Sequence, residues 1–182
     1  MIPLAGSGGP NLVHSNAPFL PDAPDLITVK GELSPYHVST ATTEEALKVE
    51  NAIRIMAIAA VGDHQPSVSD HLDFSVRSLK AVDEILDRTT LGTYNKENAT
   101  VFVAELGAYL GVVMESETRT TEHRGRWHTS PTYYFSALRF PSRLKGILET
   151  SPFALVAKRL ADKDKEVPLL HKYVGIMKII KE

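Results

Sequence analysis

The segment at residues 101–116, VFVAELGAYLGVVMES, constrains the fold more than any other part of the chain. It is apolar almost all round a helical wheel, which predicts a helix buried at the centre of the molecule. It also contains two glycines four residues apart, Gly107 and Gly111. A glycine in a helix interior costs about 1 kcal/mol relative to alanine. We therefore expect a bulky neighbour, such as a sheet or the single tryptophan Trp127, to lie close against these glycines.

Composition limits the chain to one domain of ordinary size. It has 182 residues, 43% of them hydrophobic, which is enough for a single core and short for two. It has no cysteine, so disulfides, thiolate metal sites and cysteine nucleophiles are excluded. We expect no membrane-spanning segment, because no apolar run reaches the required length. The N-terminal residues lack the basic region of a secretory signal, so a cytoplasmic location is expected.

Proline sets the N-terminal part of the chain apart. Six of the eleven prolines lie in residues 1–38, and proline at that density blocks helices and central strands. We predict an extended arm, rich in proline and glycine, over 1–38, in which residues 26–30, LITVK, have strand character. A single domain should occupy residues 39–182.

The pattern within 39–182 predicts an α+β fold. Apolar residues recur at helical spacing over 42–61 and 72–88, ahead of the central helix. After it, the composition is typical of strands at 118–122, 127–130, 132–140 and 143–149. Ser151-Pro152 and Pro168 are typical helix starts, so two helices should close the chain. Helices packed on a small antiparallel sheet form the expected architecture.

Charge is distributed unevenly along the chain. Residues 1–116 have seven Lys and Arg against fifteen Asp and Glu, whereas 117–182 have thirteen against seven, and the net charge is −2. We expect the two parts to pack together and neutralise each other. The alternative is an acidic and a basic face that each bind an oppositely charged partner. The candidate binding residues of the acidic helices are Asp70, Asp73, Asp83, Glu84 and Asp87.

Arginines surround an aromatic cluster that follows the central helix. Arg124 and Arg126 precede Trp127, and Tyr133 comes shortly after it. Arginine, tryptophan and tyrosine are enriched among the residues that anchor protein interfaces. Cations beside stacking rings also bind single-stranded nucleic acid. We predict that these residues lie on an exposed hairpin, which would serve either kind of binding.

Glu105 lies on the central helix four residues before Tyr109, so the two are neighbours on its surface. A buried carboxylate needs a partner. We expect an arginine from the C-terminal part of the chain (Arg139, Arg143 or Arg159) or the Tyr109 hydroxyl. Without a partner the pKa of Glu105 would rise, and Glu105 could act as a general acid or base in a pocket with Gly107, Tyr109 and Gly111.

Two Asp-His pairs, Asp63-His64 and Asp70-His71, lie close together in the sequence. Imidazole and carboxylate groups bind zinc, iron and manganese. The spacing matches no metal motif, however, and Asp73 beyond it is explained as a helix cap. We therefore expect a solvated loop and assign neither a metal nor a cofactor. The chain also lacks a phosphate-binding glycine loop and the G-x-S-x-G and H-E-x-x-H motifs.

Four features occur in an order that is found in a known group of domains. They are LDFSVRSLKAVDEIL at 72–86, AELGAYLGVVM at 104–114, Trp127, and SPFALVAKRL at 151–160. Together they resemble a loosely defined family of small uncharacterised bacterial domains with a serine-leucine helix, a helix with a G-x-Y-x-G pattern, a tryptophan hairpin and a PF…KRL helix. The family often has a glutamate where this chain has Val112. Some similar domains are encoded beside toxin or effector genes and are suspected immunity proteins. The resemblance therefore implies binding to a toxin and no catalytic residues.

The sequence leaves three functions open. We favour a non-enzymatic protein-binding domain, in its most specific form a bacterial immunity protein that neutralises a cognate toxin or effector by direct binding. One alternative is an enzyme with a pocket around Glu105 and Tyr109. The other is a single-stranded nucleic-acid binder that uses the hairpin at 124–127. The expected partner is a protein, and no membrane partner is expected.

Overall fold

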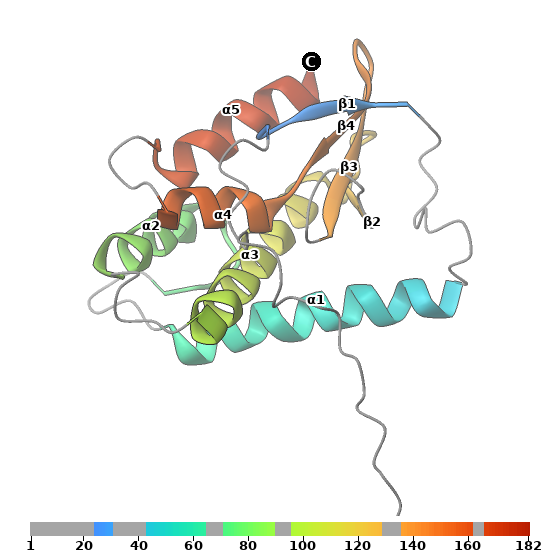
Figure 1. Ribbon diagram of the computed structural model, residues 1–182. Helices are drawn as coiled ribbons and strands as arrows, with labels where there is room; N and C mark the ends of the chain where they lie inside the picture. The colour runs from blue at the N-terminus through green and yellow to red at the C-terminus, as the bar shows by residue number, and fades with distance from the viewer. Residues whose placement is uncertain (1–23, 31–42, 65–70, 90–95, 129–135, 162–165) are drawn as a thin grey trace, which may run out of the picture.

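The computed structural model describes residues 24–30, 43–64, 71–89, 96–128, 136–161 and 166–182, which form a single α+β domain (Figure 1). Within these residues, five α-helices pack on a four-stranded antiparallel sheet, as the sequence predicts. The elements in chain order are β1 (Ile27–Val29), α1 (Thr43–Asp63), the 3-10 helix η1 (Val76–Ser78), α2 (Leu79–Arg88), α3 (Lys96–Thr118), β2 (Arg126–His128), β3 (Ala137–Ser142), β4 (Gly146–Thr150), α4 (Pro152–Ala161) and α5 (Leu169–Lys181).

The central helix is α3, which packs against α1 on one side and α4 on the other (Figure 1). Residues 98–118 are long and apolar enough, by length and composition alone, to cross a membrane, so the statement that no apolar run reaches that length is wrong. Most of this helix is buried inside the domain. Its apolar surface is therefore explained by contact with the other elements of the fold.

The two glycines of α3 allow close packing, as predicted. A side-chain carbon built on Gly107 would lie 2.6 Å from Cδ1 of Phe153, on α4. One built on Gly111 would overlap the indole ring of Trp127 and lie 3.1 Å from Pro152. Glycine is required at both positions because α4 and the tryptophan occupy the space that larger side chains would need. The close packing offsets the lower helix stability of the two glycines.

The sheet has the strand order β1-β4-β3-β2, with every neighbouring pair antiparallel. β1 falls within the predicted arm and forms one edge, where Ile27 lies opposite Glu149. β2 forms the other edge, where Trp127 lies opposite Leu138. A tight turn joins β3 to β4, and Gly146 adopts a φ of 77° there, a left-handed conformation that favours glycine.

The strand predicted at 118–122 is wrong. α3 continues to Thr118, whose hydroxyl donates to the carbonyls of Met114 and Glu115 within the last turn. The same hydroxyl accepts a hydrogen bond from the backbone N–H of Gly125 at 3.0 Å. Local bonds to a threonine side chain therefore end the helix and turn the chain directly into β2.

The carboxylate of Asp83, on α2, binds the first turn of α5, a helix that is distant from it in the sequence. Its carboxylate accepts hydrogen bonds from the backbone N–H groups of Leu169 and Leu170, at 2.7 and 3.2 Å, in the first turn of α5. The residue is 8% exposed, so its predicted place on an acidic binding surface is wrong. Burial raises the pKa of Asp83 above its usual value, although these N–H groups and Arg159 partly offset that effect.

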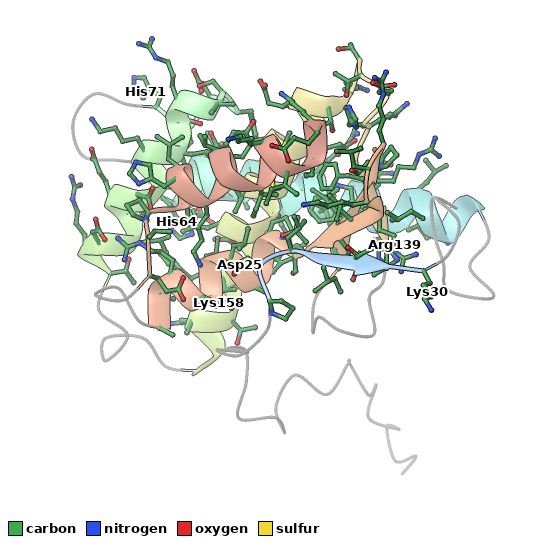
Figure 2. All side chains as sticks on the ribbon, turned by 90° about the horizontal axis from the view of Figure 1, so that it is seen from above. Asp25, Lys30, His64, His71, Arg139 and Lys158 are labelled. Atoms are coloured by element: carbon green, nitrogen blue, oxygen red, sulfur yellow. The ribbon has the colours of Figure 1, made fainter. Side chains whose placement is uncertain are left out.

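Ion pairs join the acidic and basic parts of the chain, as expected. Asp25, which precedes β1, accepts hydrogen bonds from Nζ of Lys158 on α4 at 2.8 Å and from Nζ of Lys172 on α5 at 3.1 Å. Figure 2 shows Asp25 and Lys158 on neighbouring segments. Arg159 pairs with Asp87 and lies 3.6 Å from Asp83. These contacts hold β1 and α2 against the C-terminal helices.

Candidate functional site

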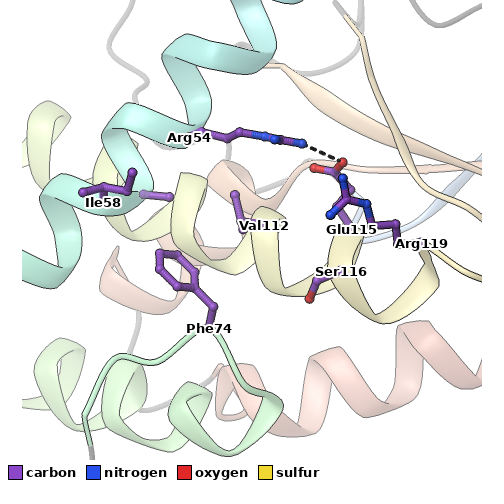
Figure 3. A pocket seen from close by; sticks show the side chains of 8 residues that line it. Arg54, Ile58, Phe74, Val112, Glu115, Ser116 and Arg119 are labelled. Carbon is purple, nitrogen blue, oxygen red and sulfur yellow. Dashed lines mark hydrogen bonds and ion pairs between the residues drawn. The ribbon is translucent and has the colours of Figure 1, made fainter.

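An open groove of about 250 Å³ lies between α1, α3 and the segment that precedes η1 (Figure 3). We call it the α1–α3 groove. Its lining consists of Arg54, Ala57 and Ile58 from α1, Phe74 from the segment before η1, Val112, Glu115 and Ser116 from α3, and Arg119 from the turn that follows α3. The lining combines an apolar floor with two arginines and one carboxylate.

Phe74 forms one wall of the groove in an unusual backbone conformation. Its φ is 62°, and it is the only described non-glycine residue with a positive φ. For a bulky side chain this conformation is strained and needs support from its surroundings. The ring of Phe74 stacks on that of Tyr109, with ring centroids 4.8 Å apart and an angle of 27° between the planes.

Tyr109 holds Phe74 through its hydroxyl as well as its ring. The hydroxyl accepts a hydrogen bond of 2.8 Å from the backbone N–H of Phe74 and lies 2.5 Å from Oγ of Ser78. Ser78 donates its own hydrogen to the carbonyl of Ser75 at 2.6 Å, so Tyr109 is the donor to Ser78. Burial raises the pKa of Tyr109, although the bonds to Ser78 and Phe74 partly oppose this, and the group remains a neutral hydroxyl.

The polar end of the groove is built around Glu115, which is 7% exposed. One of its oxygens accepts a hydrogen bond of 3.1 Å from the indole N–H of Trp127. The other lies 3.5 Å from a guanidinium nitrogen of Arg54, which also pairs with Glu50 one turn earlier on α1. Figure 3 shows Arg54 reaching from α1 toward this carboxylate.

Arg119 lies at the same end of the groove, in the turn that directly follows α3 (Figure 3). Its backbone N–H bonds to the carbonyl of Ser116. Its side chain is exposed, and no described residue forms an ion pair or side-chain hydrogen bond with it. The groove therefore presents one guanidinium that has no partner among the described residues, beside one that is already paired.

Beside the groove, the outer face of α1 exposes several apolar side chains along with Lys48 and Asn51. Three large aliphatic side chains of this helix are exposed: Leu47 (53%), Ile55 (67%) and Ile58 (63%). Ile58 belongs both to this face and to the groove lining. Exposed apolar residues that adjoin a groove are typical of interaction sites, whereas single scattered ones are not.

Glu105 does not pair with an arginine, so that prediction is wrong. Its carboxylate lies 2.6 Å from Nε2 of His64, the residue that follows α1, and His64 packs edge-on against Phe102. The three expected arginines bind other carboxylates: Arg139 binds Glu149, Arg143 binds Glu122, and Arg159 binds Asp87. Glu105 is 9% exposed and does not line the groove. The pair joins the end of α1 to α3.

Trp127 does not lie on an exposed hairpin, so that prediction is wrong. It is 2% exposed, packed on α3 and tilted against Phe153 with ring centroids 5.9 Å apart. Arg124 and Arg126 are exposed, but the ring that they were expected to flank is inside the core. Its contact with Gly111 is instead the one expected from the two glycines of α3, since the missing side chain leaves room for the indole.

The remaining predicted residues do not gather at one place. Asp73 is exposed, and hydrogen bonds from the hydroxyl and the backbone N–H of Ser75 lower its pKa. Glu84 pairs with Arg88 on the same helix. Asp70 and Tyr133 lie outside the described residues. Within the described ranges, no three His, Asp or Glu side chains converge as metal ligands would.

A buried triad of polar side chains on the sheet has no counterpart in the sequence predictions. Glu149 accepts hydrogen bonds from Nε of Arg139 at 2.8 Å and lies 2.6 Å from Nε2 of His128. Glu149 and His128 are 0% and 1% exposed. Nδ1 of His128 has no hydrogen-bond partner among the described residues. The three residues come from adjacent strands, so only the register of the sheet brings them together.

Comparison of the chain with protein-family models, with curated proteins and with solved structures finds no match to any of them. The resemblance drawn from the sequence therefore stays a prediction. The functional argument depends on the geometry of the α1–α3 groove and the face of α1 beside it.

Proposed function

We propose that this protein is a non-enzymatic protein-binding domain and that the α1–α3 groove, with the outer face of α1, is its binding surface. The observation that carries the proposal is Phe74, which buried Tyr109 holds at positive φ in the wall of an open groove. Strained conformations of this kind cluster at binding sites. A wall that is ordered before binding also loses little conformational entropy when a partner docks.

The composition of the surface supports the same function. Ile55 and Ile58 are each more than half exposed, and two arginines and an aromatic ring line the adjoining groove. Arginine and aromatic residues carry much of the binding energy at protein interfaces, surrounded by apolar contacts that exclude water. Such a surface suits a protein partner better than a polar substrate.

In its most specific form, the proposal is that the partner is a toxin or effector of bacterial origin, which the domain neutralises by occupying its surface. This form draws on the resemblance of residues 72–86, 104–114, 127 and 151–160 to domains suspected of immunity functions. The more general form, a protein-binding domain, depends only on the groove and on α1.

A paired substitution tests the proposal. Ile58→Asp places a charge in the groove, and Val174→Asp places the same charge on α5, where Val174 is 54% exposed and away from the groove. Each tagged variant is incubated with lysate of the source cells, and retained proteins are identified by mass spectrometry. We expect one partner that wild type and Val174→Asp retain and Ile58→Asp loses. Equal retention by both variants would contradict the proposed surface.

A further inference from the structure

We infer that the partner segment bound in the α1–α3 groove is an acidic-apolar peptide stretch, with a carboxylate placed against Arg119 and Arg54 and an apolar side chain placed between Phe74, Val112 and Ile58. This inference deepens the proposed function and rests on it. It names the chemistry of the partner from the charges and the size of the groove.

The arginine pair determines the charge of the partner. Arg119 has no ion pair or side-chain hydrogen bond with any described residue, although a guanidinium offers five N–H donors in a planar fork that fits a carboxylate. Arg54 is 42% exposed at its side chain, pairs with Glu50 on the same helix and lies 3.5 Å from Glu115. A partner carboxylate would therefore be received by Arg119, with the charge of Arg54 beside it.

The single carboxylate of the lining does not favour a basic partner. Glu115 is nearly buried, and one of its oxygens is bound to the indole N–H of Trp127. Its other oxygen faces Arg54. Glu50 and Glu115 both lie against Arg54, so the exposed positive charge of the lining is that of Arg119. Opposite charge on the partner would speed association and set its orientation.

The size of the groove favours a peptide over a free small molecule. Its volume of about 250 Å³ lies below the range of roughly 300–1,000 Å³ that is typical of small-molecule sites. A space of this size holds one or two anchoring side chains, and the exposed face of α1 continues the contact outside it. Ile55 and Ile58 would then cover the apolar flank of the same bound segment.

The test is a selection of random peptides displayed on phage, with the full-length chain as bait. We expect enrichment of sequences that combine Asp or Glu with Leu, Ile, Met or Phe. A selected peptide should bind Arg119→Glu at least about tenfold more weakly, the factor that corresponds to about 1.4 kcal/mol. It should bind Lys145→Glu, which makes the same charge change in the exposed β3–β4 turn, as tightly as wild type. Changing the peptide's acidic residue to lysine should restore binding to Arg119→Glu.

The outcomes separate the inference from the proposed function. The selected peptides could instead be basic or uncharged and bind Ile58→Asp more weakly, but bind Arg119→Glu as tightly as wild type. That result would contradict an acidic partner and would leave the groove as a protein-binding surface. A dimer of this chain that Ile58→Asp dissociates, measured by analytical ultracentrifugation, would place a second copy in the groove and also overturn the inference. If no peptide is enriched and lysate capture is also insensitive to Ile58→Asp, both the inference and the proposed function fail.

Discussion

The backbone N–H of Phe74 donates a hydrogen bond of 2.8 Å to the hydroxyl of Tyr109, a residue 35 positions later in the chain. The same tyrosine supports the ring of Phe74 by stacking. A residue of the core helix therefore determines the backbone conformation of the groove wall. Because a core residue supports the groove wall, substitutions there should change the stability of the domain as well as its binding.

The strain at Phe74 predicts an unusual order of stability. Phe74→Gly removes the strain of the positive φ, because glycine adopts this conformation without a steric cost. Phe74→Ala keeps the strain, because alanine still has a Cβ. We expect the glycine variant to be more stable than the alanine variant by about 1 kcal/mol. Urea unfolding of both proteins gives the difference. At Val174, an exposed position in the middle of α5, the alanine variant should be more stable than the glycine variant by about 1 kcal/mol. If the alanine variant were the more stable one at position 74 as well, Phe74 would be unstrained.

Removal of the Tyr109 hydroxyl should destabilise the domain. Tyr109→Phe leaves the N–H of Phe74 without its acceptor and Oγ of Ser78 without its donor. We expect the free energy of unfolding to fall by about 1–3 kcal/mol. Tyr173→Phe is the matched control, since no described residue forms a hydrogen bond with that hydroxyl, and it should change stability much less. Chemical unfolding measures both, and equal losses would contradict the role given to Tyr109.

The close approach of Trp127 to α3 predicts opposite effects for two glycine substitutions. Gly111→Ala would overlap the indole ring, which must shift to make room. We expect a loss of about 1–3 kcal/mol from this overpacking. Gly175→Ala, on α5, meets open space and should raise stability by about 0.4–1 kcal/mol. Thermal unfolding distinguishes the two. Stabilisation by Gly111→Ala would mean that the indole moves freely.

The contacts of Asp25 predict a loss of stability in acid. Burial alone would raise the pKa of Asp25, but hydrogen bonds and charge from Lys158 and Lys172 outweigh it, so the pKa lies below its usual value of 3.8. A carboxyl whose pKa is lowered by folding stabilises the domain above its unfolded pKa and loses that effect as pH falls through its folded pKa. We expect wild type to exceed Asp25→Asn in stability by about 1 kcal/mol at neutral pH, a figure reduced by the partial exposure of Asp25.

Unfolding curves at several pH values measure this contribution of Asp25. The difference between wild type and Asp25→Asn should shrink as pH falls below about 3.8 and should be constant above it. Lys178→Met, on the exposed surface of α5, serves as a control for loss of a lysine, whereas Lys158→Met should remove much of the effect of Asp25. A difference that grows in acid would contradict the assigned ion pairs.

The sequence by itself determined the order of the elements, the central helix and the close packing at Gly107 and Gly111. These signals are local or periodic: apolar spacing identifies the buried helix, and two costly glycines require a near neighbour. Ser151 followed by Pro152 marks the start of α4 for the same kind of reason, since the serine caps the N–H of Ala154 within one turn.

Only the tertiary structure decided which distant side chains meet. His64 reaches Glu105 across 41 positions, and Asp83 reaches the N–H of Leu169 across 86. A carboxylate finds its partner through the packing of whole helices, which no spacing in the sequence encodes. The strained conformation of Phe74 also depends on tertiary structure, because its support comes from Tyr109 on α3. The same holds for the groove that Phe74 lines.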